Sequence, residues 1–283
     1  MTSPGRTMGV EEEYLLLGAD GVPTAVAGAA LKAVEESGGD QDVPGGDVGG
    51  ELKQQQLETG TRPCTDLGEL FAELRAARGR AQEAAASTGA RIAALGTSPV
   101  EVTAVSSPNP RYLELNRRFG LTAREQLTCG CHVHVGVADE EEGVAVLDRI
   151  GRWLPVLLAL STNSPFWHGA DSSYASYRSQ VWSRWPSAGP TALFGSPAGY
   201  REVVEQMVAT GTIMDAGMVY FDARLSQRYP TVEVRVADVC LEARDAALVA
   251  ALARGLVETA AGEARRGEAA PPVRVELLRA ATW

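Results

Sequence analysis

Lysine and histidine are scarce in this sequence. Lysine occurs only as Lys32 and Lys53, so arginine supplies nearly all of the 26 basic residues, and 283 residues include three histidines. The 36 acidic residues give a net charge of −10, which argues against nucleic acid as a partner because its phosphates would be repelled. The excess of carboxylate is compatible with bound divalent cations, although most acidic side chains are ordinarily solvated surface.

Long apolar runs are also missing. The longest candidate, WLPVLLALSTNSPFW, is interrupted by proline and polar residues and is too short to span a bilayer. The N-terminal MTSPGRTMGVEEEY has no apolar segment after a basic start, so we expect no signal peptide. The four cysteines form no C-x-x-C pair, and Cys129 and Cys131, two apart on a predicted strand, are expected to be buried packing residues. We therefore predict a cytoplasmic protein without a membrane segment.

Three familiar motifs of nucleotide-binding and hydrolytic proteins are absent. There is no G-x-x-x-x-G-K-S/T loop, no G-x-G-x-x-G after a predicted strand and no G-x-S-x-G turn. If this protein binds ATP, metal ions and carboxylates must hold the phosphates in place of a glycine-rich loop.

Two of the three histidines, His132 and His134, stand two residues apart in the segment CGCHVHVGV. Alternate side chains of a strand share one face, so both imidazoles would lie on one face and the intervening apolar residues on the other. Such a strand suits a sheet that packs on helices with one side and lines a site with the other. This motif alone leaves a structural pair, a ligand or catalytic pair, and a zinc site with the neighbouring cysteines open.

Charged residues recur in other predicted strands, where burial is costly without a partner. Glu11 and Glu13 share one face of a strand, and Glu233 shares a face with Arg235. Glu51 and Glu58 are seven apart, so a regular strand would place them on opposite faces, and only a bulge or bend lets both serve one site.

These carboxylates have both a structural and a functional interpretation. The EEE run could protect an exposed sheet edge, and Glu233 with Arg235 could be a simple ion pair. Several carboxylates brought together repel one another, and a hard divalent cation such as Mg²⁺ relieves that repulsion and bridges to phosphates. An arginine on the same surface fits a phosphate or a carboxylate.

The expected elements alternate irregularly along the chain. They are strands at 8–17, 90–99, 127–137, 218–226 and 230–239, an extended piece at 49–61, helices at 24–37, 66–87, 139–160, 197–209, 241–266 and 273–281, and an aromatic-rich loop at 163–190. Mixed order of this kind favours an α+β fold with an antiparallel sheet.

Five ordered blocks carry a family resemblance that runs from about residue 8 to the chain end. They are GVEEEYLLL, ELKQQQLETGT, CGCHVHVGV, ALSTNSPFWHGADSSYASYRSQVWSRWP and YFDARLSQRYPTVEVRVADVC. Together they resemble the bacterial glutamate–cysteine ligase type 2 family, also called carboxylate–amine ligases. The resemblance implies a single ligase catalytic domain over residues 1–283 that is similar to the glutamine synthetase catalytic domain, with a curved antiparallel sheet of about six strands and helices packed on one face. Family members usually continue beyond VELLRAATW, so it also implies a shortened C-terminal part.

The implied chemistry is ATP-dependent, with Mg²⁺ or Mn²⁺ as the cofactor ion. A carboxylate, such as the γ-carboxylate of glutamate, would attack ATP to give an acyl phosphate, and an amine such as that of cysteine would then form the amide. The partners would be these small molecules, and the resemblance also implies a homodimer.

The family's functional residues match specific positions here. The resemblance implies Glu11, Glu13, Glu51, Glu58, His132 and Glu233 as metal ligands. It implies His132 and Arg235 as catalytic residues, and Arg178, Arg235, His134, Trp167 and Tyr174 as residues that bind substrate or nucleotide. Two other functions remain as alternatives: a nucleotide- or amino-acid-binding member that has lost turnover, and a metal-dependent hydrolase that uses the same cluster.

Overall fold

One antiparallel sheet organises the computed structural model, which describes residues 5–36 and 46–283. Its strands are β1 (Met8–Leu17), β2 (Val48–Gly50), β3 (Gln56–Gly60), β4 (Arg91–Ala93), β5 (Gly130–Gly136), β8 (Ala223–Leu225) and β9 (Thr231–Asp238). The order is β2-β3-β1-β5-β9-β8, with β4 paired to β1 beyond the end of β5, and each pairing is antiparallel. A separate hairpin joins β6 (Phe166–Trp167) to β7 (Ala170–Asp171). The α+β prediction is confirmed, with seven strands in the main sheet.

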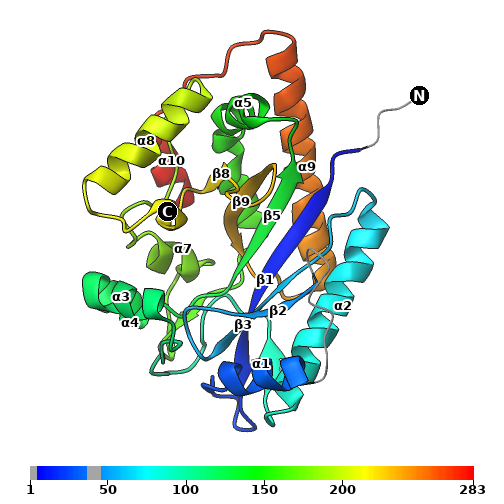
Figure 1. Cartoon of the computed structure of the whole chain (residues 1–283), viewed down its shortest axis with the longest axis vertical. Helices are drawn as coiled ribbons and strands as arrows, with labels where there is room; N and C mark the ends of the chain where they lie inside the picture. The colour runs from blue at the N-terminus through cyan, green and yellow to red at the C-terminus, as the bar shows by residue number, and fades with distance from the viewer. Residues whose placement is uncertain (1–4, 37–45) are drawn as a thin grey trace.

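Helices flank this sheet on both sides (Figure 1). They are α1 (Ala27–Glu36), α2 (Leu67–Ala86), α3 (Pro110–Phe119), α4 (Leu121–Glu125), α5 (Glu140–Ile150), α6 (Leu154–Leu160), α7 (Tyr177–Trp182), α8 (Pro197–Ala209), α9 (Ala243–Arg265) and α10 (Val275–Thr282). The expected helix at 24–37 is α1, and residues 37–39 lie outside the described part. No helix within the described residues is long and apolar enough to cross a membrane.

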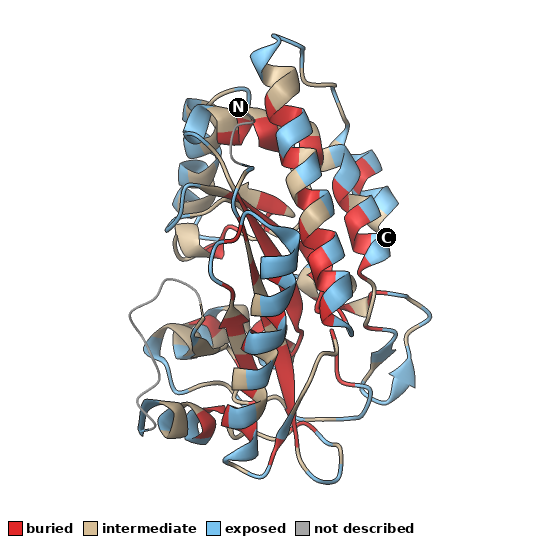
Figure 2. Ribbon diagram, turned by 90° about the vertical axis from the view of Figure 1, so that its right-hand side faces the viewer, coloured by how far each residue is buried: buried red, intermediate tan, exposed pale blue. Residues whose placement is uncertain are grey.

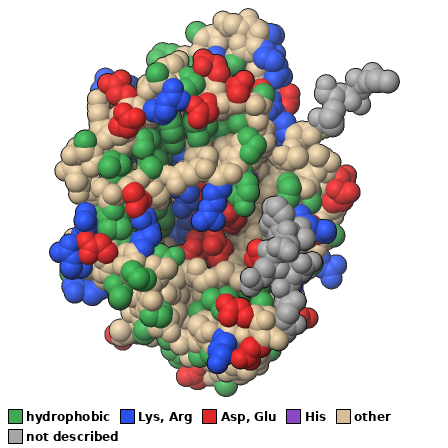
Figure 3. All heavy atoms as spheres, in the orientation of Figure 1, with side chains coloured by type: hydrophobic (Ala, Val, Ile, Leu, Met, Phe, Trp, Pro, Cys, Tyr) green, Lys and Arg blue, Asp and Glu red, His purple; other side chains and the backbone are tan. Residues whose placement is uncertain are grey.

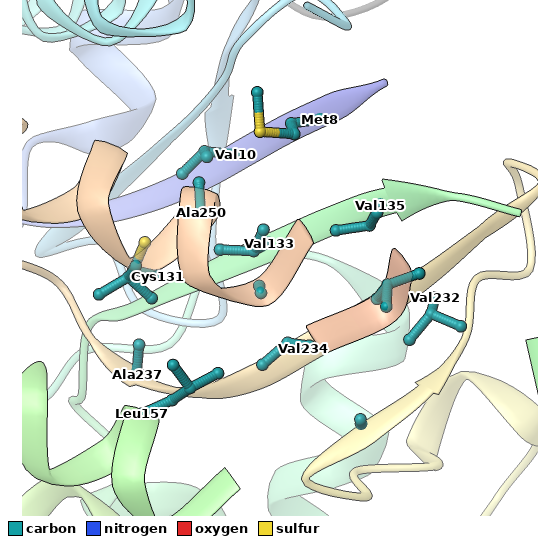
Figure 4. Close-up of a cluster of buried hydrophobic side chains, with 14 of the residues drawn as sticks. Met8, Val10, Cys131, Val133, Val135, Leu157, Val232, Val234, Ala237 and Ala250 are labelled. Atoms are coloured by element: carbon teal, nitrogen blue, oxygen red, sulfur yellow. The ribbon is translucent and has the colours of Figure 1, made fainter. Parts of the chain in front are cut away.

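The main core lies between the sheet and helices α5, α6 and α9. Alternation along β1, β5 and β9 supplies its sheet side, because most residues on the core side of these strands are apolar and buried. Figure 4 shows Val10, Val133 and Val234 from these neighbouring strands packed together with Ala250 of α9. In Figure 2, α9 and α2 present their buried residues toward the sheet and their exposed residues outward. The expected packing of helices on one face therefore holds for the long helices.

A second, smaller core lies on the other side of the sheet. Helices α3, α4, α7 and α8 stand there, away from α2 and α9 (Figure 1). The buried residues of this smaller core include Leu115, Ala123, Trp185, Met218 and Phe221, from these helices and the segments that follow them. This group forms a wall beside the open face of the sheet, so that face is a basin and not a flat surface.

Three expected elements are shorter than their patterns predict. The strand expected at 90–99 is reduced to the three residues of β4. The helix expected at 139–160 consists of α5, a short 3₁₀ turn at Gly151–Trp153, and α6 with Pro155 near its start. Proline lacks an N–H and is tolerated in the first turn of a helix, so it marks a new helix and not an interior position. The strand expected at 218–226 is reduced to β8, because residues 216–218 form a 3₁₀ turn.

A buried ion pair ties the sheet to α2. Glu12 on the core side of β1 accepts hydrogen bonds from Arg78 Nη2 at 2.6 Å and Nε at 3.0 Å. The same guanidinium donates to the carbonyl oxygens of Cys240 and Leu241, which follow β9. Only 1% of the Glu12 side chain is exposed, so its charge depends on this partner.

We therefore predict that Arg78→Met lowers the free energy of unfolding by about 3 kcal/mol, because one charge of a buried pair is left without compensation. Urea unfolding measures this change, and Arg91→Met on the exposed side of β4 is the matched control. Equal effects of the two substitutions would show that the Glu12 pair does not stabilise the sheet.

Candidate active site

Strand register places the predicted charged residues on one face of the sheet, opposite the main core. Residues directly opposed on antiparallel strands share a face. The opposed pairs are Glu11 with His132, Glu13 with Glu58, and His134 with Glu233. Figure 3 shows the hollowed face of the molecule, with acidic and basic side chains gathered side by side on its floor.

Glu51 joins this group through the β2–β3 hairpin. Gly49 lies opposite Glu58, and Glu51 is two residues beyond Gly49, which returns its side chain to the same face. The chain then turns through residues 52–55 before β3 begins. The bend that the seven-residue spacing requires is therefore present, and burial with the charge of Glu13 raises the pKa of Glu51 to about 7.

Arg235 reaches the site at an irregularity in β9. Cys131 pairs with Ala237 but Val133 pairs with Val234, so β9 has one extra residue opposite His132. Such a bulge re-aims side chains and reverses their alternation. Glu233 and Arg235 stay on the charged face, whereas Ala237 joins the core.

The donor atoms cluster tightly enough to hold cations. Among the described residues, one group contains Glu11, His132 and Glu233, and another contains Glu13, Glu58 and His132. Within each group the ligand atoms lie within 4.8 Å of one another. His132 Nε2 is buried and has no hydrogen-bond partner within the described part of the chain, which leaves a donor atom available to an ion.

The chemistry of these donors fits a hard divalent cation. Carboxylate oxygens are preferred by Mg²⁺ and Mn²⁺, and an imidazole can add one ligand. Neither group includes a cysteine, and Cys131 is packed in the core on the opposite side of the sheet. The zinc site with cysteines that the motif left open is therefore not formed.

The surroundings of two carboxyl groups, Glu51 and Glu58, raise their pKa values and so favour the uncharged form. Burial raises the pKa of Glu58 well above its usual value, and the neighbouring charges of Glu51, Glu11 and Glu13 raise it further. Several carboxylates therefore cannot all ionise cheaply in this space, and a bound cation would remove the penalty.

The other half of the cluster is ionised. Burial opposes charge on Glu11 most strongly, yet His132 and His134 bring its pKa below the usual value. Burial likewise opposes charge on Glu233, but Arg235 and Arg224 lower its pKa to about 2. Arg224 binds Glu233 through Nε at 2.6 Å and Nη2 at 3.1 Å, and Arg235 donates to Glu233 Oε1.

The two histidines have different surroundings. Burial and the positive charge of Arg235 lower the pKa of His132, which favours the neutral imidazole that can ligate an ion. His134 Nδ1 is 2.9 Å from Thr231 Oγ1, and its Nε2 is 3.5 Å from Glu11 Oε1. Nε2 of both histidines is buried without a hydrogen-bond partner among the described residues, so the two differ at Nδ1. His134 Nδ1 is engaged by Thr231, whereas His132 Nδ1 lies 3.7 Å from Glu11 Oε2, and only His132 belongs to the ligand groups.

Arg178 is buried beside the end of β5. Its Nη1 lies 3.8 Å from Asp238 Oδ1, and a Cβ atom on Gly130 would overlap the guanidinium. Asp238 in turn accepts hydrogen bonds from Ser164 Oγ at 2.6 Å and Ser176 Oγ at 2.8 Å. The glycine before Cys131 thus leaves the space in which this arginine lies.

The two predicted aromatic residues lie in other surroundings. Trp167 is in β6 and lines a cavity of about 280 Å³ together with His168 and Leu127. Tyr174 follows β7 and packs edge-on against Trp283, with ring centroids 5.6 Å apart. Neither belongs to the metal-binding groups of the described residues. Their role toward substrate stays a prediction.

Sequence reasoning missed two groups that hold the site in shape. Arg224 fixes Glu233, and Asp238 anchors the loop that carries Arg178. The sequence does contain a signal for both residues, because each is a charged residue in an apolar strand segment: Arg224 in FDAR and Asp238 in VADV. Alternation of side chains could not assign Asp238 to the correct face, because the bulge at Arg235 reverses that alternation before Asp238 is reached.

Two solved structures share the fold of this chain. A bifunctional glutathione synthetase from Pasteurella multocida superimposes with a TM-score of 0.68 at 16% identity, over 98% of this chain and 41% of that chain. A glutamate–cysteine ligase from Francisella tularensis in complex with AMP gives a TM-score of 0.64 at 12% identity, over 99% of this chain and 70% of that one. The chain therefore has the α+β fold of these two proteins.

The chain belongs to glutamate–cysteine ligase family 2 (GCS2), which it matches over residues 7–283. A relative from Streptomyces avermitilis, provisionally named glutamate–cysteine ligase 2-1, is 56% identical over 98% of this chain and 76% of that protein. The chain spans about two fifths of the bifunctional glutathione synthetase.

The raised pKa of Glu51 predicts a pH-dependent stability without metal. The pKa of the Glu51 carboxyl is 4.5 as the ordinary value and about 7 in the folded protein. Its contribution to the free energy of unfolding is therefore fully present below pH 4.5 and is lost as the pH rises through 7. Glutamine carries no charge at any pH, so Glu51→Gln should become more stable than the wild type between pH 5 and 8, by at most about 3 kcal/mol. Urea unfolding in EDTA measures the difference.

Glu83→Gln on the exposed side of α2 is the control and should show no pH-dependent difference. Added Mg²⁺ should stabilise the wild type more than Glu51→Gln at pH 8, because the variant has lost one carboxylate of the cluster. A stability difference that does not change with pH would contradict the assigned burial of the Glu51 charge.

Proposed function

We propose that this protein is an ATP- and Mg²⁺-dependent carboxylate–amine ligase that forms a γ-glutamyl-type amide through an acyl phosphate. The observation that carries the proposal is the buried cluster of five carboxylates and His132, with Arg235 beside it, in a chain of this family. Glutamate is the proposed carboxylate donor and an amino acid such as cysteine the amine acceptor, in line with the names of the relatives.

The proposed ligands follow the two clusters, which share His132. Glu11, His132 and Glu233 would hold one ion, and Glu13 and Glu58 beside His132 a second, with Glu51 added because its charge acts on Glu58. Bound Mg²⁺, or Mn²⁺ in its place, would neutralise the triphosphate and so reduce its repulsion of the attacking carboxylate. The residues themselves orient the phosphates toward the basin floor, which replaces the missing glycine-rich loop.

The proposed reaction has two steps. A carboxylate oxygen of the donor attacks the γ-phosphorus of ATP, the bond to the ADP oxygen breaks, and an acyl phosphate and ADP form. The amine nitrogen then attacks the carbonyl carbon, phosphate leaves with the bonding electrons, and the nitrogen loses a proton to give the amide. The positions of donor and phosphate supply much of the rate, because both reactants are held in line.

Arg235 is the residue proposed to act on the transferred phosphoryl group. Its guanidinium is held by Glu233 and lies over the Trp182 ring, 5.8 Å from the ring centroid. Its charge is therefore fixed in position before substrate binds, which is what stabilises developing negative charge most effectively. Arg178, fixed beside Asp238, is proposed to bind a substrate carboxylate, and Trp167 and Tyr174 to shape the approach to the basin.

Phosphate release from Mg-ATP tests the proposed function. The purified chain is incubated with amino acids singly and in pairs, and release that requires glutamate plus an amine supports the ligase. Release from ATP without an amine product would favour a hydrolase, and ATP binding without release would favour a member that has lost turnover. Glu233→Gln is the preferred inactive control, since Ala would leave Arg224 and Arg235 unpaired.

The unequal surroundings of the histidines predict unequal losses of activity. His132→Ala removes a proposed ligand and should lower kcat more than a hundredfold, whereas His134→Ala removes a supporting contact and should cost about tenfold. Steady-state phosphate release at saturating Mg-ATP measures both. A larger loss for His134→Ala would reverse the assigned roles.

A further inference from the structure

A small cavity of about 110 Å³ lies beside Arg235, outside the carboxylate cluster. Helix α7, helix α10 and the segment before β8 surround it, and Arg178, Trp182, Asp222, Arg235 and Arg279 are among its lining residues. A water molecule takes about 30 Å³ of liquid, so the cavity can hold a group of a few atoms. It is well below the roughly 300–1,000 Å³ of pockets for larger ligands, which excludes a whole nucleotide.

Two buried arginines in this cavity have unsatisfied donors. Arg178 and Arg235 both lie over the Trp182 ring, and each Nε is buried without a hydrogen-bond partner in the described part of the chain. An unpaired buried N–H is costly, so these groups favour an acceptor in the cavity. Arg279 of α10 adds a third positive charge from the exposed side.

Asp222 lines the same cavity with an unpaired carboxylate. Its backbone is fixed, because its N–H donates to Gly189 O at 3.0 Å and its carbonyl accepts from Arg235 N at 2.9 Å. Its side chain makes no hydrogen bond or close ion pair with any described residue. Burial raises the pKa of Asp222 to about 7, against the opposing charges of Arg178 and Arg279. A cation beside this carboxylate would remove the cost of burying it.

We propose that this cavity binds the head group of the donor amino acid, with Asp222 on its ammonium and Arg178, Arg235 and Arg279 around its α-carboxylate. This inference rests on the proposed ligase function and adds the α-amino group as a feature that the site recognises. The reacting carboxylate would then extend from the cavity toward the metal cluster, because Arg235 borders both.

The donor fits this cavity better than the amine acceptor. An acceptor amine must lose a proton before it attacks, and a neighbouring carboxylate stabilises the protonated form. The ammonium of the donor takes no part in the reaction, so a fixed ion pair can hold it without opposing the chemistry. Asp222 is therefore a specificity-determining residue in this assignment.

The test compares L-glutamate with glutarate, which lacks the α-amino group. Calorimetric titration with Mg²⁺ and a non-hydrolysable ATP analogue gives Kd for each ligand. Wild-type protein should prefer L-glutamate, and Asp222→Asn should weaken L-glutamate binding by roughly tenfold or more while changing glutarate binding by less than about twofold. Asp20→Asn, on an exposed turn after β1, is the matched control and should change neither Kd.

A second variant keeps the inference testable if Asp222→Asn does not fold. Arg279→Gln lies on an exposed helix and should weaken both ligands by a similar factor, because both carry the carboxylate that it contacts. Equal weakening of L-glutamate and glutarate by Asp222→Asn would overturn the inference, as would wild-type protein that binds neither ligand. Phosphate release is measured separately to distinguish the two proposals. If the ligase proposal is wrong, no release will depend on amino acids. If only this inference is wrong, amino-acid-dependent release will remain.

Discussion

The arrangement of this protein depends on holding several carboxylates together in one buried basin. Carboxyl groups that are close together in a poorly solvated space cannot all ionise without a large electrostatic cost. This repulsion contributes to the raised pKa of Glu51, about 7, whereas Glu233 beside Arg224 has a lowered pKa. In the opposite half, Glu233 has two guanidinium partners, and Glu11 lies within 3.7 Å of two imidazoles that lower its pKa. One half of the cluster therefore favours the ionised form of its carboxyl groups, whereas Glu51 and Glu58 in the other half have raised pKa values.

The rest of the fold supplies the rigidity that such a cluster requires. Repulsion within the basin favours separation of β1, β3 and β5, and the opposite face resists it by burying a continuous apolar layer against α9. Arg78 adds a polar tie from α2 to both β1 and the chain after β9. The smaller core around Trp185 holds α7 against the open face, and so fixes Arg178 and Trp182 beside the charged residues.

Alternation within single strands predicted most of the cluster, because the face of a side chain is a local property. Glu11, Glu13, His132 and Glu233 follow from it directly, and Glu51 required only the bend that its spacing demanded. Arg224 could not be found in this way, since its contact with Glu233 depends on the register of the β8–β9 hairpin. Asp238 was hidden for a related reason: an extra residue in β9 changes which side chains face the basin.

The same bulge also explains how a carboxylate-rich region and an arginine-rich region can lie next to each other on one strand. Regular alternation after Glu233 would direct Ala237 to the basin and Asp238 to the core, which would bury a carboxylate among valines. With the extra residue, Asp238 instead turns toward Arg178 and the serines of the aromatic loop, and Arg235 stands between the anionic cluster and the arginine-lined cavity. A single inserted residue thus separates a carboxylate-rich surface from an arginine-rich one along the same strand. Because a bulge is fixed by the hydrogen bonds on either side of it, that boundary is built into the sheet and does not depend on loop conformation.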